Sequence, residues 1–227
     1  MRLSVIIPVY NEQTTLPELL ARVRAVPVAK EIIIVDDGST DGTREWLRDR
    51  PAVAGELVLY HDHNQGKGMA LRTGLARATG EVVIIQDADL EYDPGDYPAL
   101  LAPFADPAVQ AVYGSRILGH NPGRSSFWFY WGGRLLSLLT SLLYNARLTD
   151  EATCYKLFRR ELIQSLPLTC TGFEFCPEVT AKLLKRGVRI VEVPIRYHPR
   201  SRHEGKKITW RDGVTAIRLL IRYRFLD

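Results

Sequence analysis

The residues best suited to chemistry are four carboxylic acids that follow a short apolar run. Residues 81–86 read EVVIIQ, and the next seven, DADLEYD, place Asp87, Asp89, Glu91 and Asp93 at alternate positions. Like charges this close repel one another, and each carboxylate is costly to desolvate unless a positive charge lies among them. Carboxylates spaced in this way at a strand end can reach one hard divalent cation, which prefers oxygen ligands. The pattern therefore predicts a Mg²⁺ or Mn²⁺ site that also holds the phosphates bridged by the ion.

Two other apolar runs also end in groups that could bind a ligand. EIIIVDDGSTDGT places Asp36 and Asp37 at the end of one run, and PVYNE places Tyr10 and Glu12 at the end of another. A turn followed by a helix cap explains residues 39–41 of the first motif, but it does not explain why Asp36 and Asp37 are both acidic. A carboxylate at such a strand end can accept hydrogen bonds from a base edge or a ribose hydroxyl. The two motifs together favour a nucleotide site.

A Gly-Lys-Gly sequence at residues 66–68 offers a further phosphate contact. It lacks the spacing of a Walker A loop, but Lys67 at the start of a predicted helix is placed to meet an anion. An EF-hand does not fit the acidic run, because Tyr92 stands where the loop glycine is needed and Pro98 where the last glutamate is needed.

The segments that position these residues alternate between strand-like and helix-like patterns. Continuous apolar runs separated by segments of helical spacing imply βαβ units and a mostly parallel sheet covered on both faces. In such a sheet ligands bind beyond the carboxyl ends of the strands, so the acidic motifs should meet at one edge. The predicted strands are residues 3–9, 31–36, 56–61, 81–86 and 109–114.

The alternation weakens after residue 115. A long amphipathic segment is followed by ATCYKLFRRE, which reads as a strand and a turn, and the C-terminal tail spaces its apolar residues as a helix does. The remaining predictions are an amphipathic segment at 126–146, a helix near 174–186, a strand at 188–199 and a helix at 209–225.

Composition and charge set limits on the class of protein. The chain has 227 residues, 46% hydrophobic and 25% charged, with a formal charge of +4, as expected of a globular domain with a sizeable core. Three cysteines without a CxxC pattern favour free thiols in a reducing compartment. The aromatic run FWFYW and the basic tail predict contact with a membrane surface. Nucleic acid is disfavoured as a partner, because no recognition motif accompanies the basic residues.

Five motifs in this order and spacing resemble a family 2 glycosyltransferase with the GT-A fold. They are LSVIIPVYNE, EIIIVDDGSTDGT, NQGKGMALRTGL, GEVVIIQDADLEYDP and VYGSR, within residues 3–116. GGRLLSLL, TDEATCYKLFRRE and YHPRSRHEGKKITWRDG are similar to the dolichyl-phosphate mannose synthase branch and its bacterial polyprenyl-phosphate relatives. The resemblance implies an α/β, Rossmann-like, mostly parallel sheet flanked by helices, with amphipathic interfacial helices in the C-terminal half. It also implies one GT-A domain over 1–227, with a nucleotide-sugar half (1–116) and an acceptor and membrane half (117–227).

The resemblance also implies roles for individual residues. Glu91 falls where relatives carry a glutamine or a similar group on the metal side, and EGKKI departs from the serine-containing version of the dolichyl enzymes, which leaves Arg200 and Arg202 as alternatives. The implied donor-binding residues are Pro8, Tyr10, Glu12, Val35, Asp36, Asp37, Lys67, Asp87, Ala88 and Asp89. The implied metal ligands are Asp87, Asp89 and Glu91, and the implied acceptor-phosphate contacts are Arg116, Arg134, Arg200, Arg202, Lys206 and Lys207.

These roles predict an inverting, metal-dependent transfer of mannose from GDP-mannose to a polyprenyl or dolichyl phosphate. Asp89 and Arg116 would stabilise the charge that develops on the leaving diphosphate. The alternatives are a UDP-sugar donor or a hydroxyl acceptor, for which Asp150 is the candidate base, and, less favoured, a nucleotidyltransferase or a non-enzymatic membrane-associated binding protein. The expected location is the cytoplasmic face of the membrane, with a possible membrane-protein partner.

Overall fold

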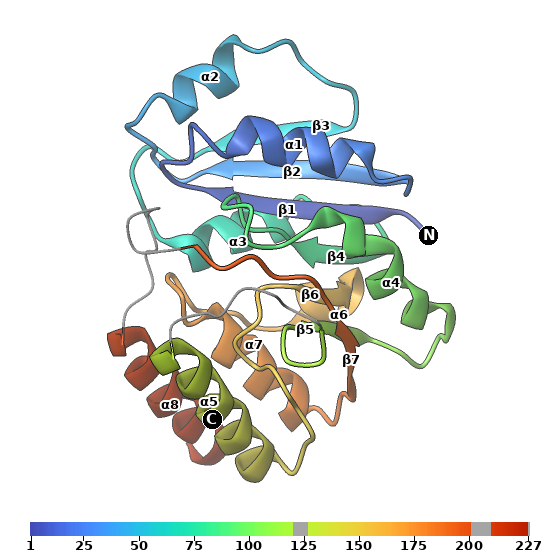
Figure 1. Cartoon of the computed structure of the whole chain (residues 1–227), viewed down its shortest axis with the longest axis vertical. Helices are drawn as coiled ribbons and strands as arrows, with labels where there is room; N and C mark the ends of the chain where they lie inside the picture. The colour runs from blue at the N-terminus through green and yellow to red at the C-terminus, as the bar shows by residue number, and fades with distance from the viewer. Residues whose placement is uncertain (120–126, 201–209, 227) are drawn as a thin grey trace.

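One sheet forms the centre of the protein, as Figure 1 shows, and it has seven strands. The computed structural model describes residues 1–119, 127–200 and 210–226, with the backbone alone at 127–129 and 210. The strands lie in the order β3-β2-β1-β4-β6-β5-β7 across the sheet. They are β1 (Leu3–Val9), β2 (Lys30–Asp36), β3 (Glu56–Tyr60), β4 (Val82–Ile85), β5 (Ala111–Ser115), β6 (Lys156–Arg159) and β7 (Ile190–Pro194).

The sheet is mostly parallel, as its continuous apolar strands predict. β1 pairs in parallel with β2 on one side and β4 on the other, so that Val5 lies between Ile32 and Ile84. The exception is β6, which lies between β4 and β5 and is antiparallel to both. The predicted fold class is confirmed, and the five strands predicted in the first half agree with the observed strands to within two residues at each end.

Helices cover both faces of the sheet. On one face lie α1 (Leu16–Ala25), α2 (Thr43–Asp49) and α4 (Tyr97–Leu101), the last between 3₁₀ turns η1 (Pro94–Asp96) and η2 (Ala102–Ala105). On the other face lie α3 (Lys67–Leu75), α6 (Arg160–Ser165) and α7 (Phe175–Lys185). The central parallel strands β1, β2 and β4 are therefore buried on both sides, which explains why their sequences do not alternate between apolar and polar residues.

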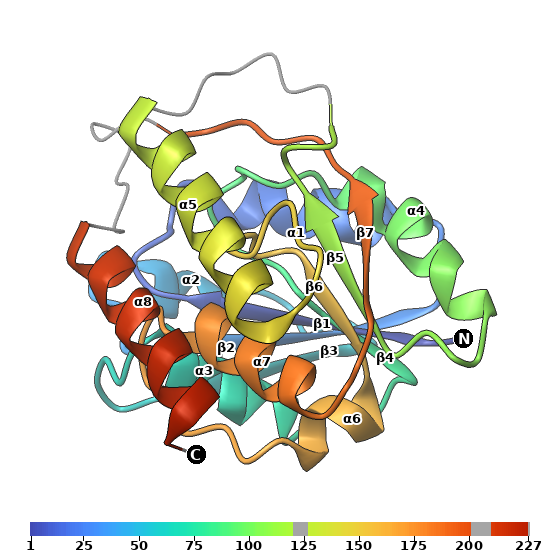
Figure 2. The same cartoon turned by 90° about the horizontal axis from the view of Figure 1, so that it is seen from below.

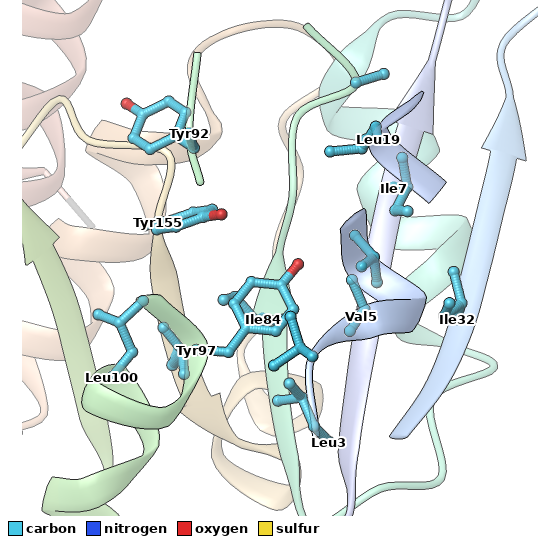
Figure 3. Packing of buried hydrophobic residues seen from close by; sticks show 14 of the residues in the cluster. Leu3, Val5, Ile7, Leu19, Ile32, Ile84, Tyr92, Tyr97, Leu100 and Tyr155 are labelled. Atoms are coloured by element: carbon cyan, nitrogen blue, oxygen red, sulfur yellow. The ribbon is translucent and has the colours of Figure 1, made fainter. Parts of the chain in front are cut away.

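The period of two along β1 divides its side chains between the two faces. Leu3, Val5 and Ile7 pack toward α1 and α4, whereas Ile6 packs toward α3. Figure 3 shows Leu3, Val5 and Ile7 beside Ile84, with a set of buried tyrosines continuing the cluster toward the end of β4. Burying a side chain of this size contributes about 1.5–3 kcal/mol, so this cluster holds in fixed register β1 and β4, the strands that lead to Glu12 and to Asp87.

Two further helices form a layer outside α7. α5 (Phe127–Tyr144) and α8 (Trp210–Phe225) run side by side and pack on α7 through Leu136, Ala181 and Leu220 (Figure 2). Both helices agree with the ranges predicted for the second half. In the part of the chain that the structure describes, no helix is both long and apolar enough to cross a bilayer.

The topology brings the ends of β1 and β4 together at the point where sheets of this kind bind ligands. From β1 the chain moves to β2 and β3 on one side, and β4 then pairs with the opposite side of β1. The carboxyl ends of β1 and β4 are therefore neighbours at a point where the strand order reverses, which is where open α/β sheets bind ligands.

Candidate active site

The carboxylates that follow β1 and β4 meet around one guanidinium group. Arg200 places Nη1 3.3 Å from Oε2 of Glu12 and Nη2 3.1 Å from Oδ2 of Asp89. Its backbone N–H donates to Oε1 of Glu91 at 2.7 Å. The acids predicted from separate motifs thus form one cluster, and of the two arginines left open by the sequence, Arg200 belongs to it.

Asp87 has a different cation as its partner. Nζ of Lys67, the first residue of α3, lies 2.5 Å from Oδ1 of Asp87 and 3.4 Å from Sγ of Cys154. Burial acts to raise the pKa of Asp87, but the positive charges of Lys67 and Arg200, together with hydrogen bonds from Lys67 and Cys154, lower it overall. Lys67 begins a helix as predicted, with a carboxylate as its partner in this structure, and its predicted contact with a phosphate stays a prediction.

The cluster brings several carboxylates close together. Lys67 and Arg200 pair with carboxylates of this cluster, which contains Glu12, Asp87, Asp89 and Glu91. Burial and the neighbouring carboxylates of Asp87 and Glu91 raise the pKa of Asp89 to about 7, in spite of Arg200. A divalent cation among these carboxylates would relieve their repulsion.

The donor set fits a hard cation. Asp87 and Asp89 present carboxylate oxygens at the carboxyl end of β4, and Mg²⁺ and Mn²⁺ are bound by one or two carboxylates together with substrate phosphates. Over residues 1–119, 127–200 and 210–226, no three His, Cys, Asp or Glu side chains are already grouped to hold a metal by themselves. A cation here would thus depend on the phosphates of a donor for the rest of its coordination.

Glu91 is held by groups other than Arg200 as well. The Tyr197 hydroxyl donates to its Oε2 at 2.8 Å, and the backbone N–H of His198 donates to its carbonyl at 2.8 Å. The preceding residue, Leu90, has φ +62°, a conformation that non-glycine residues adopt rarely and that clusters at functional sites. The predicted metal role of Glu91 stays a prediction; its observed contacts fasten the 89–91 turn to the segment after β7.

A buried tyrosine cluster supports the acidic turn, and the sequence patterns did not reveal it. Oε1 of Gln86 accepts hydrogen bonds from the hydroxyls of Tyr97 (2.6 Å) and Tyr155 (2.7 Å), and its Nε2 donates to the carbonyl of Asp87 at 3.0 Å. The Tyr92 and Tyr155 rings are neighbours in Figure 3, and their centres lie 4.7 Å apart. The one signal available in the sequence is Gln86 itself, a polar residue at the end of a buried run.

Arg116 lies beside the cluster in a charged pair. Its Nε and Nη2 each donate to the Asp150 carboxylate at 2.7 Å, and its backbone N–H donates to the same group at 2.9 Å. The guanidinium also lies over the Tyr197 ring, 5.1 Å from its centre. Burial acts to raise the pKa of Asp150, but Arg116 outweighs it and the pKa is lowered. A carboxylate held in this way orients Arg116 and is a weak proton acceptor.

The two acids after β2 are buried and bind groups of the protein. Asp36 accepts from Nε of Arg44 at 2.7 Å. Asp37 lies 2.7 Å from Nδ1 of His61 and accepts from the backbone N–H groups of Gln65 and Gly66. The predicted nucleoside contacts of both acids stay predictions; in this structure they fix the loop that leads into α3.

The other predicted donor residues divide between core and surface. Val35 and Ala88 are buried in the two core clusters, so that only their backbone faces the strand ends. Pro8 pairs in register with Val35, and Tyr10, directly after β1, is partly exposed. Their roles in binding a nucleoside stay predictions.

Of the predicted acceptor contacts other than Arg116 and Arg200, the structure describes Arg134 alone. Arg134 lies exposed on α5, and the hydrogen-bonded cluster of the described residues does not include it. Arg202, Lys206 and Lys207 lie outside the described residues.

Comparison with known proteins gives consistent relatives. The model of the family described as glycosyl transferase family 2 matches residues 4–166. An undecaprenyl-phosphate mannosyltransferase from Micrococcus luteus is 32% identical over 91% of this chain and 87% of its own length. An undecaprenyl-phosphate 4-deoxy-4-formamido-L-arabinose transferase from Pseudomonas fluorescens is 34% identical over 74% of this chain, which spans about half (49%) of that protein.

Solved structures agree on the fold. Glucosyl-3-phosphoglycerate synthase from Mycobacterium tuberculosis, in complex with Mn²⁺, uridine diphosphate and phosphoglyceric acid, superimposes with a TM-score of 0.73 over 100% of this chain and 79% of that chain. The two sequences are 21% identical, so the similarity concerns the architecture.

Proposed function

Because the chain belongs to glycosyl transferase family 2, we propose that it transfers mannose from GDP-mannose to a polyprenyl phosphate such as undecaprenyl phosphate. The single observation that carries the proposal is the cluster at the carboxyl ends of β1 and β4, in which closely spaced acidic residues lie beside Arg116 and Arg200. Such a site suits a divalent cation and a diphosphate together. The mannosyltransferase of M. luteus, which aligns over most of both chains, supports the choice of sugar and acceptor.

The donor would lie across the ends of β1, β2 and β4. Asp87 and Asp89 would hold Mg²⁺ or Mn²⁺, which when bound supplies a positive charge to the diphosphate leaving group. Lys67, at the N-terminal end of α3, would face a phosphate oxygen from a site that already favours anions. Arg116, oriented by Asp150, would add a fixed positive charge where the leaving group develops negative charge.

A phosphate acceptor removes the need for a strong base. A lipid monophosphate is already an anion near neutral pH, so the protein has only to hold it in line with the anomeric carbon. Its oxygen forms the new bond to that carbon as the bond to the nucleoside diphosphate breaks, which inverts the configuration. The observed state of Asp150, with a lowered pKa and three hydrogen bonds from Arg116, supports this choice over a hydroxyl acceptor that requires a base.

A panel of donors and acceptors tests the proposal. We expect the full chain, with Mg²⁺ or Mn²⁺, to transfer radiolabelled mannose from GDP-mannose to a short-chain polyprenyl phosphate, with loss of transfer in EDTA and recovery when metal is restored. Transfer from UDP-sugars but not from GDP-mannose would show that the proposed donor is wrong. Transfer only to hydroxyl acceptors would contradict the polyprenyl phosphate assignment.

We also propose that α5 and α8 rest on the membrane surface, where the acceptor lipid lies. Apolar side chains of α5 recur at three- and four-residue intervals on its exposed side, and α8 adds exposed apolar residues and arginines. These residues are Trp131, Leu135, Leu138 and Leu142 on α5, with Ile221, Phe225, Arg218, Arg222 and Arg224 on α8.

Charged substitutions on this face should weaken membrane binding. Leu142, 73% exposed, and Leu138, 57% exposed, would lose apolar contact with lipid when changed to glutamate. Burying a leucine is worth about 1.5–3 kcal/mol, so each change should lower the partition coefficient by about tenfold or more. Flotation with vesicles that contain phosphatidylglycerol measures it. The control is Val53→Glu, an exposed apolar residue in the loop before β3, at the far edge of the sheet; equal binding of all variants would contradict the proposal.

A further inference from the structure

We propose that Arg200 occupies the carboxylates of the metal site when no metal is bound, and that a divalent cation must displace it. This inference rests on the proposed function, because it concerns the same carboxylates. It assigns to Arg200 a second role, as an internal competitor of the metal, which the binding of phosphate does not explain.

The guanidinium joins acids from two distant parts of the chain. Nη1 and Nη2 of Arg200 lie within 3.4 Å of the two Glu12 oxygens, and Nη2 also lies 3.1 Å from Oδ2 of Asp89. The side chain is only 16% exposed, and its backbone N–H is held by Glu91. The pose of Arg200 is thus fixed from both ends, with its charge among the acids.

The contacts of Arg200 show a pose that is less than fully satisfied. Its Nε is buried and has no hydrogen-bond partner among the described residues. Its distances to Glu12, 3.3 and 3.4 Å, are long for charge-assisted hydrogen bonds, which are usually about 2.7–2.9 Å. A guanidinium with one buried donor left over among the described residues, and with long contacts to Glu12, is suited to be exchanged.

Metal and guanidinium compete for the same electron pairs. A divalent cation at Asp89 needs the carboxylate oxygen that now accepts from Arg200, and two positive charges at that distance repel each other. Metal binding therefore releases the Nη groups of Arg200 from Asp89. The freed guanidinium is then available to a phosphate oxygen, for which its planar fork is well suited.

Titration of the full chain with Mn²⁺ alone tests the competition, with free Mn²⁺ followed by electron paramagnetic resonance. We expect Arg200→Gln to bind Mn²⁺ about tenfold more tightly than the unaltered chain, since it removes both a competitor and a positive charge. Arg196→Gln is the matched control, because it removes the same charge four residues earlier from a pair with Asp93 and Asp96. Equal or weaker binding in Arg200→Gln, or an equal gain in Arg196→Gln, would overturn the proposal.

Two additions keep the result interpretable. Arg200→Lys retains the positive charge but lacks the planar guanidinium group, so its Mn²⁺ affinity should lie between those of the unaltered chain and Arg200→Gln. If Arg200→Gln does not fold, Arg200→Lys still tests the competition. A parallel titration in the presence of GDP separates the two proposals. If Mn²⁺ binds in the presence of GDP, but Arg200→Gln leaves Mn²⁺ affinity unchanged in the absence of GDP, only the competition proposal is wrong. If folded protein binds no Mn²⁺ with or without GDP, the proposed metal-dependent function is wrong as well.

Discussion

Replacing Asp89 by asparagine is expected to reduce sugar transfer by about 10³-fold or more, while the protein stays folded. The change removes one of the two carboxylates proposed to hold the metal, and a metal that stabilises a leaving group supplies several kcal/mol. The fold should tolerate the change, because Asp89 lies beside Asp87 and Glu91 and its removal relieves repulsion. Arg200 keeps Glu12 as a partner. Steady-state transfer kinetics and thermal unfolding measure the two effects.

Asp93→Asn provides the matched control for this prediction. Asp93 belongs to the same acidic run, but its carboxylate accepts from the N–H of Gly95 and pairs with Arg196, away from the cluster. Its substitution should change transfer by less than about tenfold, which corresponds to about 1.4 kcal/mol. A folded Asp89→Asn protein that keeps more than a tenth of the activity would contradict the metal role of the acidic run.

The parts of the structure that local patterns encode could be predicted from the sequence. The strand ranges of the first half, and the placing of the acids of β1 and β4 at one edge, follow from apolar runs of the right length, because burial on both faces requires them; the strand predicted at 188–199 is shorter, Ile190–Pro194. The position of Lys67 follows in the same way, since it begins a helix that is recognisable from its sequence.

Contacts between distant residues could not be predicted in this way. Arg200 meets Glu12 across 188 positions, and no local pattern encodes that its side chain points toward the acids. The tyrosines that bind Gln86 come from α4 and from the residue before β6, and they read as ordinary core residues. The antiparallel direction of β6 is also set by tertiary pairing, since its four residues carry no signal of direction.

The second large effect is expected at Asp150. Asp150→Asn should lower the free energy of unfolding by about 2–4 kcal/mol, because it leaves the partly buried Arg116 without its counter-charge. The estimate lies below that for a fully buried pair, since 23% of the Arg116 side chain is exposed. Urea unfolding measures it. Asp106→Asn, at an exposed turn where the carboxylate caps the N–H of Ala108, should change stability by less than about 1 kcal/mol.

A double-mutant cycle with Arg116→Met separates a positioning role of Asp150 from a role as a base. If Asp150 acts through Arg116, the double variant should recover part of the lost stability, because neither charge is then unpaired. Each single variant should lower kcat/KM by about 10²–10³-fold, as loss of one charge-stabilising group does. The double variant should lose little more than either. Should Asp150→Asn abolish transfer while Arg116→Met remains active, Asp150 would be a base and the acceptor a hydroxyl.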